Sequence, residues 1–190
     1  MPAIQFCPAC GGPIQELIPV GDNRKRPVCS TCERVHYQNP NVVVGCVAYY
    51  QEGYLLCRRA IEPRSGFWTI PAGYLELNES TEEGALREAH EESGAQMEIR
   101  SLLAVYNLPH LSQVQLLYLA EMTTPDLMPG EESLEAEIFA WKDIPWSELA
   151  FSTVYWALHH ARLMRTNKTL SPDLASEKLL RPAPANPLEV

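Results

Sequence analysis

The residues best suited to chemistry in this sequence are glutamates gathered in one stretch, GYLELNESTEEGALREAHEESGA, at residues 73–95. Glu88 and Glu92 are four residues apart and Glu91 is three from Glu88, so on a helix their carboxylates share one face. Like charges this close repel unless a positive group lies between them. A hard divalent cation meets that need, and Mg²⁺ commonly binds together with substrate phosphates. The alternative, a solvated acidic helix face, is the simpler interpretation for any single pair of glutamates.

The same stretch carries the signals that position these glutamates on a helix. Ser80 is a suitable N-cap, with Glu83 three residues later as in a capping box, and Gly94 is a natural stop. Arg87 lies inside the predicted helix and can pair with Glu79 in the preceding loop. That ion pair would hold the loop against the helix.

The complete pattern resembles the signature box of the Nudix hydrolases. Gly73 is followed after five residues by Glu79, and after seven more by the run REAHEESGA at residues 87–95. The preceding residues 68–72, WTIPA, are similar to the strand and turn that lead into that box, with Ala72 where many members carry glycine. The resemblance implies a metal-dependent hydrolase of nucleoside diphosphates linked to another group.

The resemblance also assigns roles to residues. It implies a catalytic Mg²⁺ or Mn²⁺ ion held by three side chains and one backbone carbonyl, those of Glu88, Glu91, Glu92 and Ala72. Glu79 is expected to orient Arg87 or a metal-bound water. The residues expected to contact the substrate are Arg59, at the position that commonly faces the phosphates, Gly73 in the box, and His110 in a loop.

Hydrolysis also needs a general base within reach of the attacking water. Glu135, which opens a predicted strand after an acidic loop, is one candidate, and Glu92 and Glu132 are the others. Members of the family differ in where this base lies, so the resemblance does not choose among the three.

Four cysteines near the N-terminus form two CxxC pairs, Cys7 with Cys10 and Cys29 with Cys32. Two such pairs match a structural zinc site, in which four thiolates complete a tetrahedron. Redox pairs or disulfides are the alternatives, and disulfides are rare in the cytoplasm. Because four cysteines leave no position for a bound water, we expect Zn²⁺ to support folding and not catalysis.

Length, charge and hydropathy limit the remaining possibilities. The 190 residues suffice for one domain with a small attachment. A net charge of −9 argues against a broad nucleic-acid-binding surface. The resemblance implies a small-molecule nucleotide diphosphate as the substrate. No apolar run approaches membrane-spanning length, and the N-terminus lacks the blocks of a signal peptide, so we expect a cytoplasmic protein with no membrane partner. The family resemblance adds the expectation of a homodimer.

The predicted elements divide the chain into a zinc ribbon over 1–38, a Nudix hydrolase domain over 39–168 and a proline-rich, partly disordered tail over 169–190. Apolar runs predict strands at 42–50, 54–59, 97–106, 113–122 and 135–141, with helices from Pro145 to about residue 164. The acidic segment 123–132 predicts a mobile loop. These elements indicate an α/β layered domain, and the resemblance implies the Nudix α/β/α sandwich with a mixed sheet.

A more specific resemblance reduces the number of candidate substrates. Among Nudix hydrolases with a zinc ribbon, the NADH and NAD-cap pyrophosphatases carry an SQPWP-like signature, which is absent from the corresponding residues 110–116. The segments HYQNP at 36–40 and LLCRRAIEPR at 55–64 look like a second group, which includes a plant chloroplast FAD and ADP-ribose pyrophosphatase. That likeness implies hydrolysis of FAD to FMN and AMP, or of ADP-ribose to AMP and ribose 5-phosphate. An NADH or NAD-cap pyrophosphatase and a non-catalytic nucleotide-sensing or nucleic-acid-binding module remain as alternatives.

Overall fold

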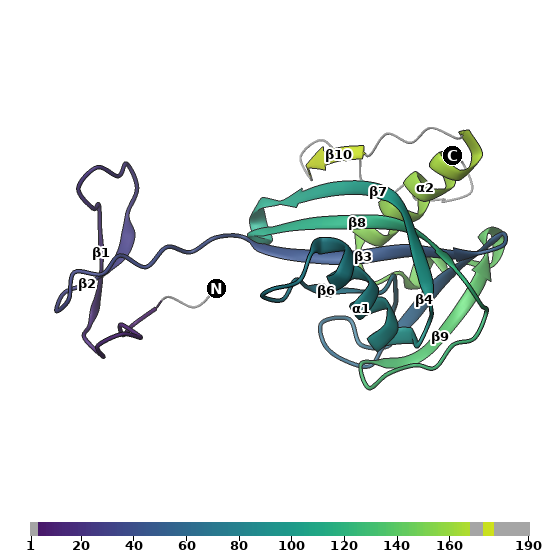
Figure 1. The fold of residues 1–190 in the computed structure, drawn as a ribbon, viewed down its shortest axis with the longest axis horizontal. Helices are drawn as coiled ribbons and strands as arrows, with labels where there is room; N and C mark the ends of the chain where they lie inside the picture. Colours follow the sequence, from purple (N-terminus) through teal and green to yellow (C-terminus); the bar gives the residue numbers. More distant parts are fainter. Residues whose placement is uncertain (1–3, 168–172, 177–190) are drawn as a thin grey trace. The chain divides into compact units, whose positions relative to one another are not determined.

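The computed structural model describes residues 4–167 and 173–176. The chain divides into two compact units, Met1–Asn39 and Pro40–Val190. In the small unit, β1 (Ile14–Leu17) and β2 (Arg26–Cys29) form an antiparallel hairpin. In the large unit, one mixed sheet is covered by α1 (Thr81–Ser93) and α2 (Ser152–Asn167) (Figure 1). No helix in the described part of the chain is both long and apolar enough to cross a membrane.

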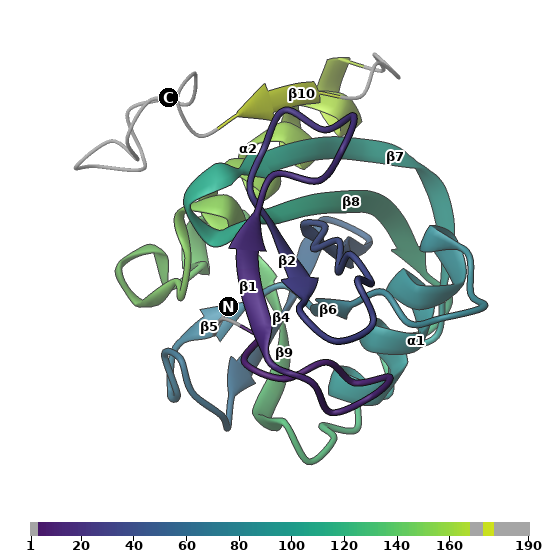
Figure 2. The ribbon, with the colours of Figure 1, turned by 90° about the vertical axis from the view of Figure 1, so that its left-hand side faces the viewer.

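The sheet of the large unit joins strands that are distant in sequence. Its strands are β3 (Asn41–Tyr50), β4 (Gly53–Arg59), β5 (Trp68–Thr69), β6 (Ala72–Tyr74), β7 (Met97–Leu108), β8 (Gln113–Met122), β9 (Ser133–Ala140) and β10 (Asp173–Ser176). The order is β10-β7-β8-β3-β4-β5, with β6 paired to β3 and β9 to β4. β3 runs parallel to β8 and antiparallel to β4 and β6. The antiparallel strands β7 and β8 run side by side as long curved strands (Figure 2).

The two faces of the sheet carry separate cores because successive residues of β3 point to opposite sides. Val44 and Cys46 pack with Ala85 of α1 in one core, whereas Val47 packs with Val154 of α2 in the other. Each helix therefore covers its own face, which confirms the predicted α/β/α sandwich with a mixed sheet.

Helix α1 begins and ends at the predicted residues. The Ser80 hydroxyl accepts a hydrogen bond from the Glu83 N–H at 3.2 Å, and the Glu83 carboxylate accepts one from the Ser80 N–H at 2.7 Å. Gly94 ends the helix at φ +67°, a left-handed conformation that suits glycine, and its N–H donates to the His90 carbonyl. The capping box fixes where the turns of the helix fall, and so which glutamates share a face.

The C-terminal half differs from its prediction in two places. The helical segment expected from Pro145 is interrupted: Trp146–Glu148 forms a short 3-10 turn, and α2 starts only at Ser152. Most of the tail predicted over 169–190 lies outside the described residues. The four residues of it that are described, Asp173–Ser176, form β10 and pair in parallel with β7.

Candidate functional site

The four cysteines of the small unit converge on one point. The sulfur atoms of Cys7 and Cys32 lie 3.8 Å apart, those of Cys10 and Cys29 lie 3.5 Å apart, and all four lie within 4.8 Å of one another. In the described part of the chain, this is the one group of three or more potential metal ligands that is so tightly gathered. Four sulfur atoms gathered in this way fit a tetrahedral thiolate site, and such a site suggests Zn²⁺.

The backbone around Cys29 favours the thiolate that such a site needs. Its sulfur accepts hydrogen bonds from the N–H groups of Thr31 and Cys32, each at 3.4 Å. The bond from Cys32 is the main cause of a pKa of the Cys29 thiol lowered to about 6, against the opposing effect of burial. Gly12 leaves room for this turn, because a Cβ there would lie 2.4 Å from the Thr31 hydroxyl oxygen.

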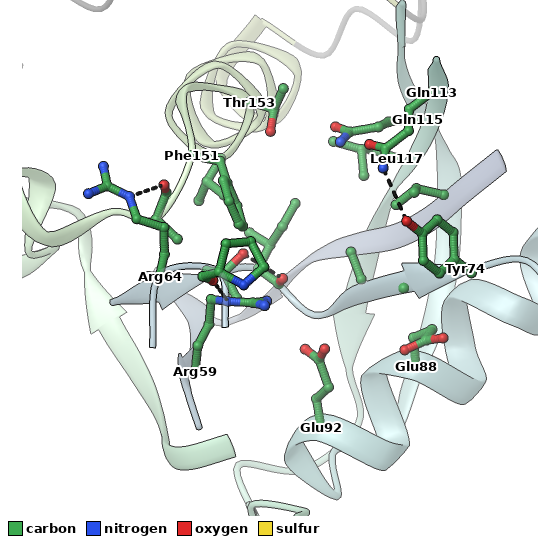
Figure 3. Close-up of a pocket in the computed structure, with 18 of the residues that line it drawn as sticks. Arg59, Arg64, Tyr74, Glu88, Glu92, Gln113, Gln115, Leu117, Phe151 and Thr153 are labelled. Atoms are coloured by element: carbon green, nitrogen blue, oxygen red, sulfur yellow. Dashed lines mark hydrogen bonds between the residues drawn. The ribbon is translucent and has the colours of Figure 1, made fainter. Parts of the chain in front are cut away.

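The large unit contains a cavity of about 1360 Å³ between α1 and the start of α2 (Figure 3). This exceeds the range of about 300–1,000 Å³ typical of small-molecule sites. Carboxylates line the end formed by α1 and the loop before β9: Glu88, Glu91, Glu92, Glu131 and Glu132. Uncharged residues of β8, of α2 and of the position just before α2 line the other end: Gln113, Gln115, Leu117, Phe151 and Thr153. The cavity therefore offers one strongly acidic end and one neutral end.

Glu92 is the most deeply buried carboxylate of the acidic end. The residue is only 8% exposed, and its Oε2 atom has no hydrogen-bond partner in the described chain. Burial, followed by the nearby charge of Glu88, raises the pKa of Glu92 to about 8. Burial also raises the pKa of Glu88, against the pull of Arg87. A buried carboxylate oxygen without a partner beside a second carboxylate fits a divalent cation with oxygen ligands.

Gly73 places Glu88 at the cavity wall. A Cβ on Gly73 would lie 2.3 Å from the carboxylate atoms of Glu88, so a larger residue here would displace that carboxylate. Both residues, and Ala72 beside them, line the cavity. The structure therefore brings Ala72, Gly73, Glu88 and Glu92 together.

Arg87 links the remaining box residues. Its Nη2 and Nε donate to the two carboxylate oxygens of Glu79 at 2.8 and 3.0 Å. Its Nη1 donates to Glu88 at 2.8 Å and to Glu91 at 3.1 Å, and Nη2 also reaches the Tyr74 carbonyl. The hydrogen bonds from Arg87 lower the pKa of Glu79 to about 2. Glu91, 58% exposed, lines the cavity but is turned toward Arg87, so its role as a cation ligand stays a prediction.

The loop at 123–132 is held against the end of α1, which differs from the mobile loop predicted. The N–H of Met128 donates to the Ser93 carbonyl at 2.7 Å, and that of Gly130 donates to the Glu92 carbonyl at 3.3 Å. A Cβ on Gly130 would lie 1.9 Å from the Glu91 carbonyl oxygen. This close approach carries Glu132 to the acidic end of the cavity.

The three candidates for the general base occupy different places. Glu92 and Glu132 line the cavity, whereas Glu135 is absent from the lining residues that the structure describes. The Glu135 carboxylate forms an ion pair with the Arg58 guanidinium at 2.9 Å. The register between β9 and β4 places these two residues opposite each other. The structure therefore does not bring Glu135 together with the other two candidates, and its role as the base stays a prediction.

The predicted substrate residues outside the box also reach the cavity. Arg59 lies at the end of β4 with its guanidinium 5.4 Å from the centre of the Phe151 ring, and its Nε donates to the Pro63 carbonyl. His110 lines the cavity from the short turn after β7. Figure 3 shows Arg59 and Glu92 pointing toward the same space from different walls.

No motif or spacing in the sequence indicates the uncharged residues that line this cavity. Gln115 lies within an apolar strand pattern, and Trp146, Thr153 and Trp156 lie in the segment predicted as helical, yet all four line the cavity. A pattern of alternation along β8 could have indicated that Gln115 shares a face with Leu117, but not that α2 leaves this part of the face uncovered.

Comparison with known proteins agrees with this geometry. A family model described as "Nudix N-terminal" matches residues 5–38, and the "NUDIX domain" model matches residues 39–165. The crystal structure of a NUDIX hydrolase from Nitrosomonas europaea is 42% identical, covers 92% of this chain and 100% of its own, and superposes with a TM-score of 0.83.

Two curated relatives carry more specific descriptions. The chain is 30% identical over 119 residues to an ADP-ribose pyrophosphatase of Methanocaldococcus jannaschii, spanning 60% of this chain and 69% of that protein. It is 28% identical over 146 residues to the NAD-capped RNA hydrolase NudC of Vibrio parahaemolyticus, spanning 75% of this chain and 54% of that protein. The chain thus spans about half the length of NudC. From the matching domain, the box geometry and the cysteine cluster together, this chain belongs to the Nudix family as a pyrophosphohydrolase with an N-terminal Nudix zinc ribbon.

Proposed function

We propose that this enzyme hydrolyses the diphosphate bond of an ADP-linked compound, with ADP-ribose as the first choice, giving AMP and ribose 5-phosphate. FAD, giving FMN and AMP, is the second compound of the same class. The similarity to an ADP-ribose pyrophosphatase supports the first choice. The segments at 36–40 and 55–64, which resemble those of FAD and ADP-ribose pyrophosphatases, keep FAD within the proposal.

The observation that carries this proposal is the pair of carboxylates at the acidic end of the cavity. Glu92 buries an oxygen without a partner beside Glu88, and Arg59 reaches the same space from another wall. A substrate diphosphate fits between them, because its oxygens can share a cation with the glutamates and accept hydrogen bonds from the guanidinium. A purely structural acidic patch would not leave a buried carboxylate oxygen unpaired.

Each residue then has a separate task. When bound, a divalent cation such as Mg²⁺ or Mn²⁺ neutralises the diphosphate charge and lowers the pKa of water. Glu88 and Glu92 hold it, with Glu91 and the Ala72 carbonyl as further ligands, while Arg59 orients the phosphates. Glu132 accepts a proton from the attacking water, whose oxygen bonds to phosphorus as the P–O bond of the anhydride breaks. Glu79 keeps Arg87 in place.

A direct test incubates the zinc-loaded enzyme with Mg²⁺ or Mn²⁺ and ADP-ribose, FAD or NADH, and measures AMP. We expect AMP from ADP-ribose or FAD, and we expect Glu92→Gln and Glu91→Gln each to lower kcat by at least about 100-fold. Glu137→Gln is the matched control, because Glu137 is an exposed residue of β9 outside the described cavity lining. Absence of AMP from every compound would refute the proposal.

A second experiment separates the candidate bases. Replacing Glu132 by Gln should lower kcat by about 10²–10⁴-fold, the usual contribution of a positioned base, while cation affinity changes little. The corresponding Glu135→Gln variant should keep its activity, since its carboxylate pairs with Arg58. If Glu135→Gln lowers kcat more than Glu132→Gln does, Glu135 is the general base.

NAD-linked substrates form the second candidate function. The similarity to NudC spans 75% of this chain, which favours NADH or NAD-capped RNA. The absence of an SQPWP-like signature at 110–116 and the net charge of −9 weigh against it. Faster AMP release from NADH than from ADP-ribose in the same assay would decide for this candidate.

A further inference from the structure

We propose that the neutral end of the cavity binds the adenine ring of the substrate, and that Gln115 is the residue that distinguishes adenine from other bases. The inference rests on the proposed function, since the adenine ring is common to ADP-ribose, FAD and NAD. It goes beyond that function because it names the part of the substrate that each end of the cavity accepts.

Along one face of β8, the side chains change from aliphatic to polar. Leu119 and Leu117 belong to the core that packs against α2. Gln115 and Gln113 continue the same face by the period of two residues, and both line the cavity. An amide therefore replaces an aliphatic side chain at the point where α2 stops covering the sheet.

Gln115 has an amide group ready to bind a ligand. The Nε2 of Gln113 already donates to the Tyr74 hydroxyl at 3.3 Å. Gln115, in contrast, is half-buried and makes no side-chain hydrogen bond within the described residues. Gln113 is therefore a matched control for Gln115, because both amides lie on the same face of the strand and only that of Gln113 already forms a hydrogen bond.

A second polar group faces the same space from α2. Thr153 is only 9% exposed, and its hydroxyl makes no hydrogen bond to the part of the chain that the structure describes. Figure 3 shows this hydroxyl directed into the cavity between Phe151 and Gln115. Although the residue is mostly buried, its hydroxyl is open to the cavity and can therefore form a hydrogen bond with a ligand.

The surroundings of these two groups suit a neutral planar ring. Phe151 is 37% exposed and presents an aromatic surface, and Leu117 adds an aliphatic one. Aromatic rings stack on bases of any kind, so stacking gives affinity without selectivity. The acidic end lies across the cavity on α1, which leaves the diphosphate at that end and the base at this one (Figure 3).

The amide of glutamine gives the selectivity. Its oxygen can accept from the N6 amino group of adenine while its nitrogen donates to N7, a pairing with about 1–3 kcal/mol of discrimination. Hypoxanthine carries an oxygen at position 6, so the same amide oxygen would face another acceptor. We therefore expect the enzyme to prefer ADP-ribose over IDP-ribose by about 5–150-fold in kcat/KM, which is that energy expressed as a ratio.

The test compares ADP-ribose with IDP-ribose in the wild type, Gln115→Met and Gln113→Met. Methionine keeps the length of the side chain and removes the amide. In Gln115→Met the preference for adenine should fall to about twofold or less, mainly through slower ADP-ribose hydrolysis. In Gln113→Met the preference should persist. A wild type without preference, or a Gln115→Met variant that slows both substrates equally, would overturn the inference.

Binding provides a readout that does not depend on turnover. Trp146 and Trp156 line the cavity, so intrinsic fluorescence can report the binding of AMP and IMP. Tighter binding of AMP than of IMP, lost in Gln115→Met, would support the inference even if no diphosphate compound is hydrolysed. Hydrolysis of ADP-ribose together with equal binding of AMP and IMP would leave the proposed function standing and refute the adenine site.

Discussion

Replacing Glu92 by glutamine should make the cation-free protein more stable at alkaline pH. Burial and the charge of Glu88 raise the pKa of Glu92 from 4.5 to about 8 in the folded state. A raised folded-state pKa favours the fold at low pH, and that advantage is lost as the pH rises from about 4.5 through 8. The pKa difference of about 3.5 corresponds to about 5 kcal/mol. Glutamine stays neutral, so the variant should exceed the wild type by up to about 5 kcal/mol at pH 8.5 and by about 1 kcal/mol or less at pH 5.

Urea unfolding followed by tryptophan fluorescence measures this difference, because all four tryptophans lie in the large unit. Mg²⁺ is removed by gel filtration without a chelator, so that an ion held by the four cysteines is not stripped from the protein. Adding Mg²⁺ at pH 8.5 should stabilise the wild type and leave the variant unchanged, since the ion and the buried charge compensate each other. A variant that is less stable than the wild type at pH 8.5, or a parallel pH dependence of the two proteins, would refute the reasoning.

Three further substitutions probe the packing around the site and the ribbon. Gly73→Ala would place a Cβ 2.3 Å from the Glu88 carboxylate, so kcat/KM should fall at least about tenfold with an unchanged far-UV spectrum; normal activity would contradict the close packing. Gly130→Ala would place a Cβ 1.9 Å from the Glu91 carbonyl oxygen and should cost about 1–3 kcal/mol in urea unfolding. Cys29→Ser should lower the zinc content, measured by atomic absorption, from about one ion per chain to near zero, and retained zinc would exclude the four-cysteine site.

The helix of the box could be predicted from sequence because its signals are local. Ser80, Glu83 and Gly94 lie within one segment, and their capping geometry depends on neighbours at fixed spacing. The cluster of four cysteines could also be predicted, because each CxxC pair forms a local turn that brings its two sulfur atoms close together. In both cases the spacing of residue types determines the local structure without reference to the rest of the chain.

The position of Glu135 and the neutral end of the cavity could not be predicted in this way. Glu135 opposes Arg58 because of the register between β9 and β4, which join segments far apart in sequence. Gln115 and Thr153 meet one cavity only because α2 begins at Ser152, after a turn that interrupts the expected helix. Such contacts follow from tertiary packing, whereas sequence periodicity reports only the preferred face of each element.

The attachment of the segment 123–132 to α1 has a consequence for sequence variation. Surface connections usually tolerate insertions and deletions, because few of their backbone groups are engaged. Here Met128 and Gly130 occupy the last carbonyls of the helix, and the Glu132 carbonyl accepts from Ala60 at the end of β4. Inserting or deleting one residue between Gly130 and Glu132 would shift a carboxylate of the cavity. We therefore expect the length of this connection to be the same in related proteins, even where its amino acids differ.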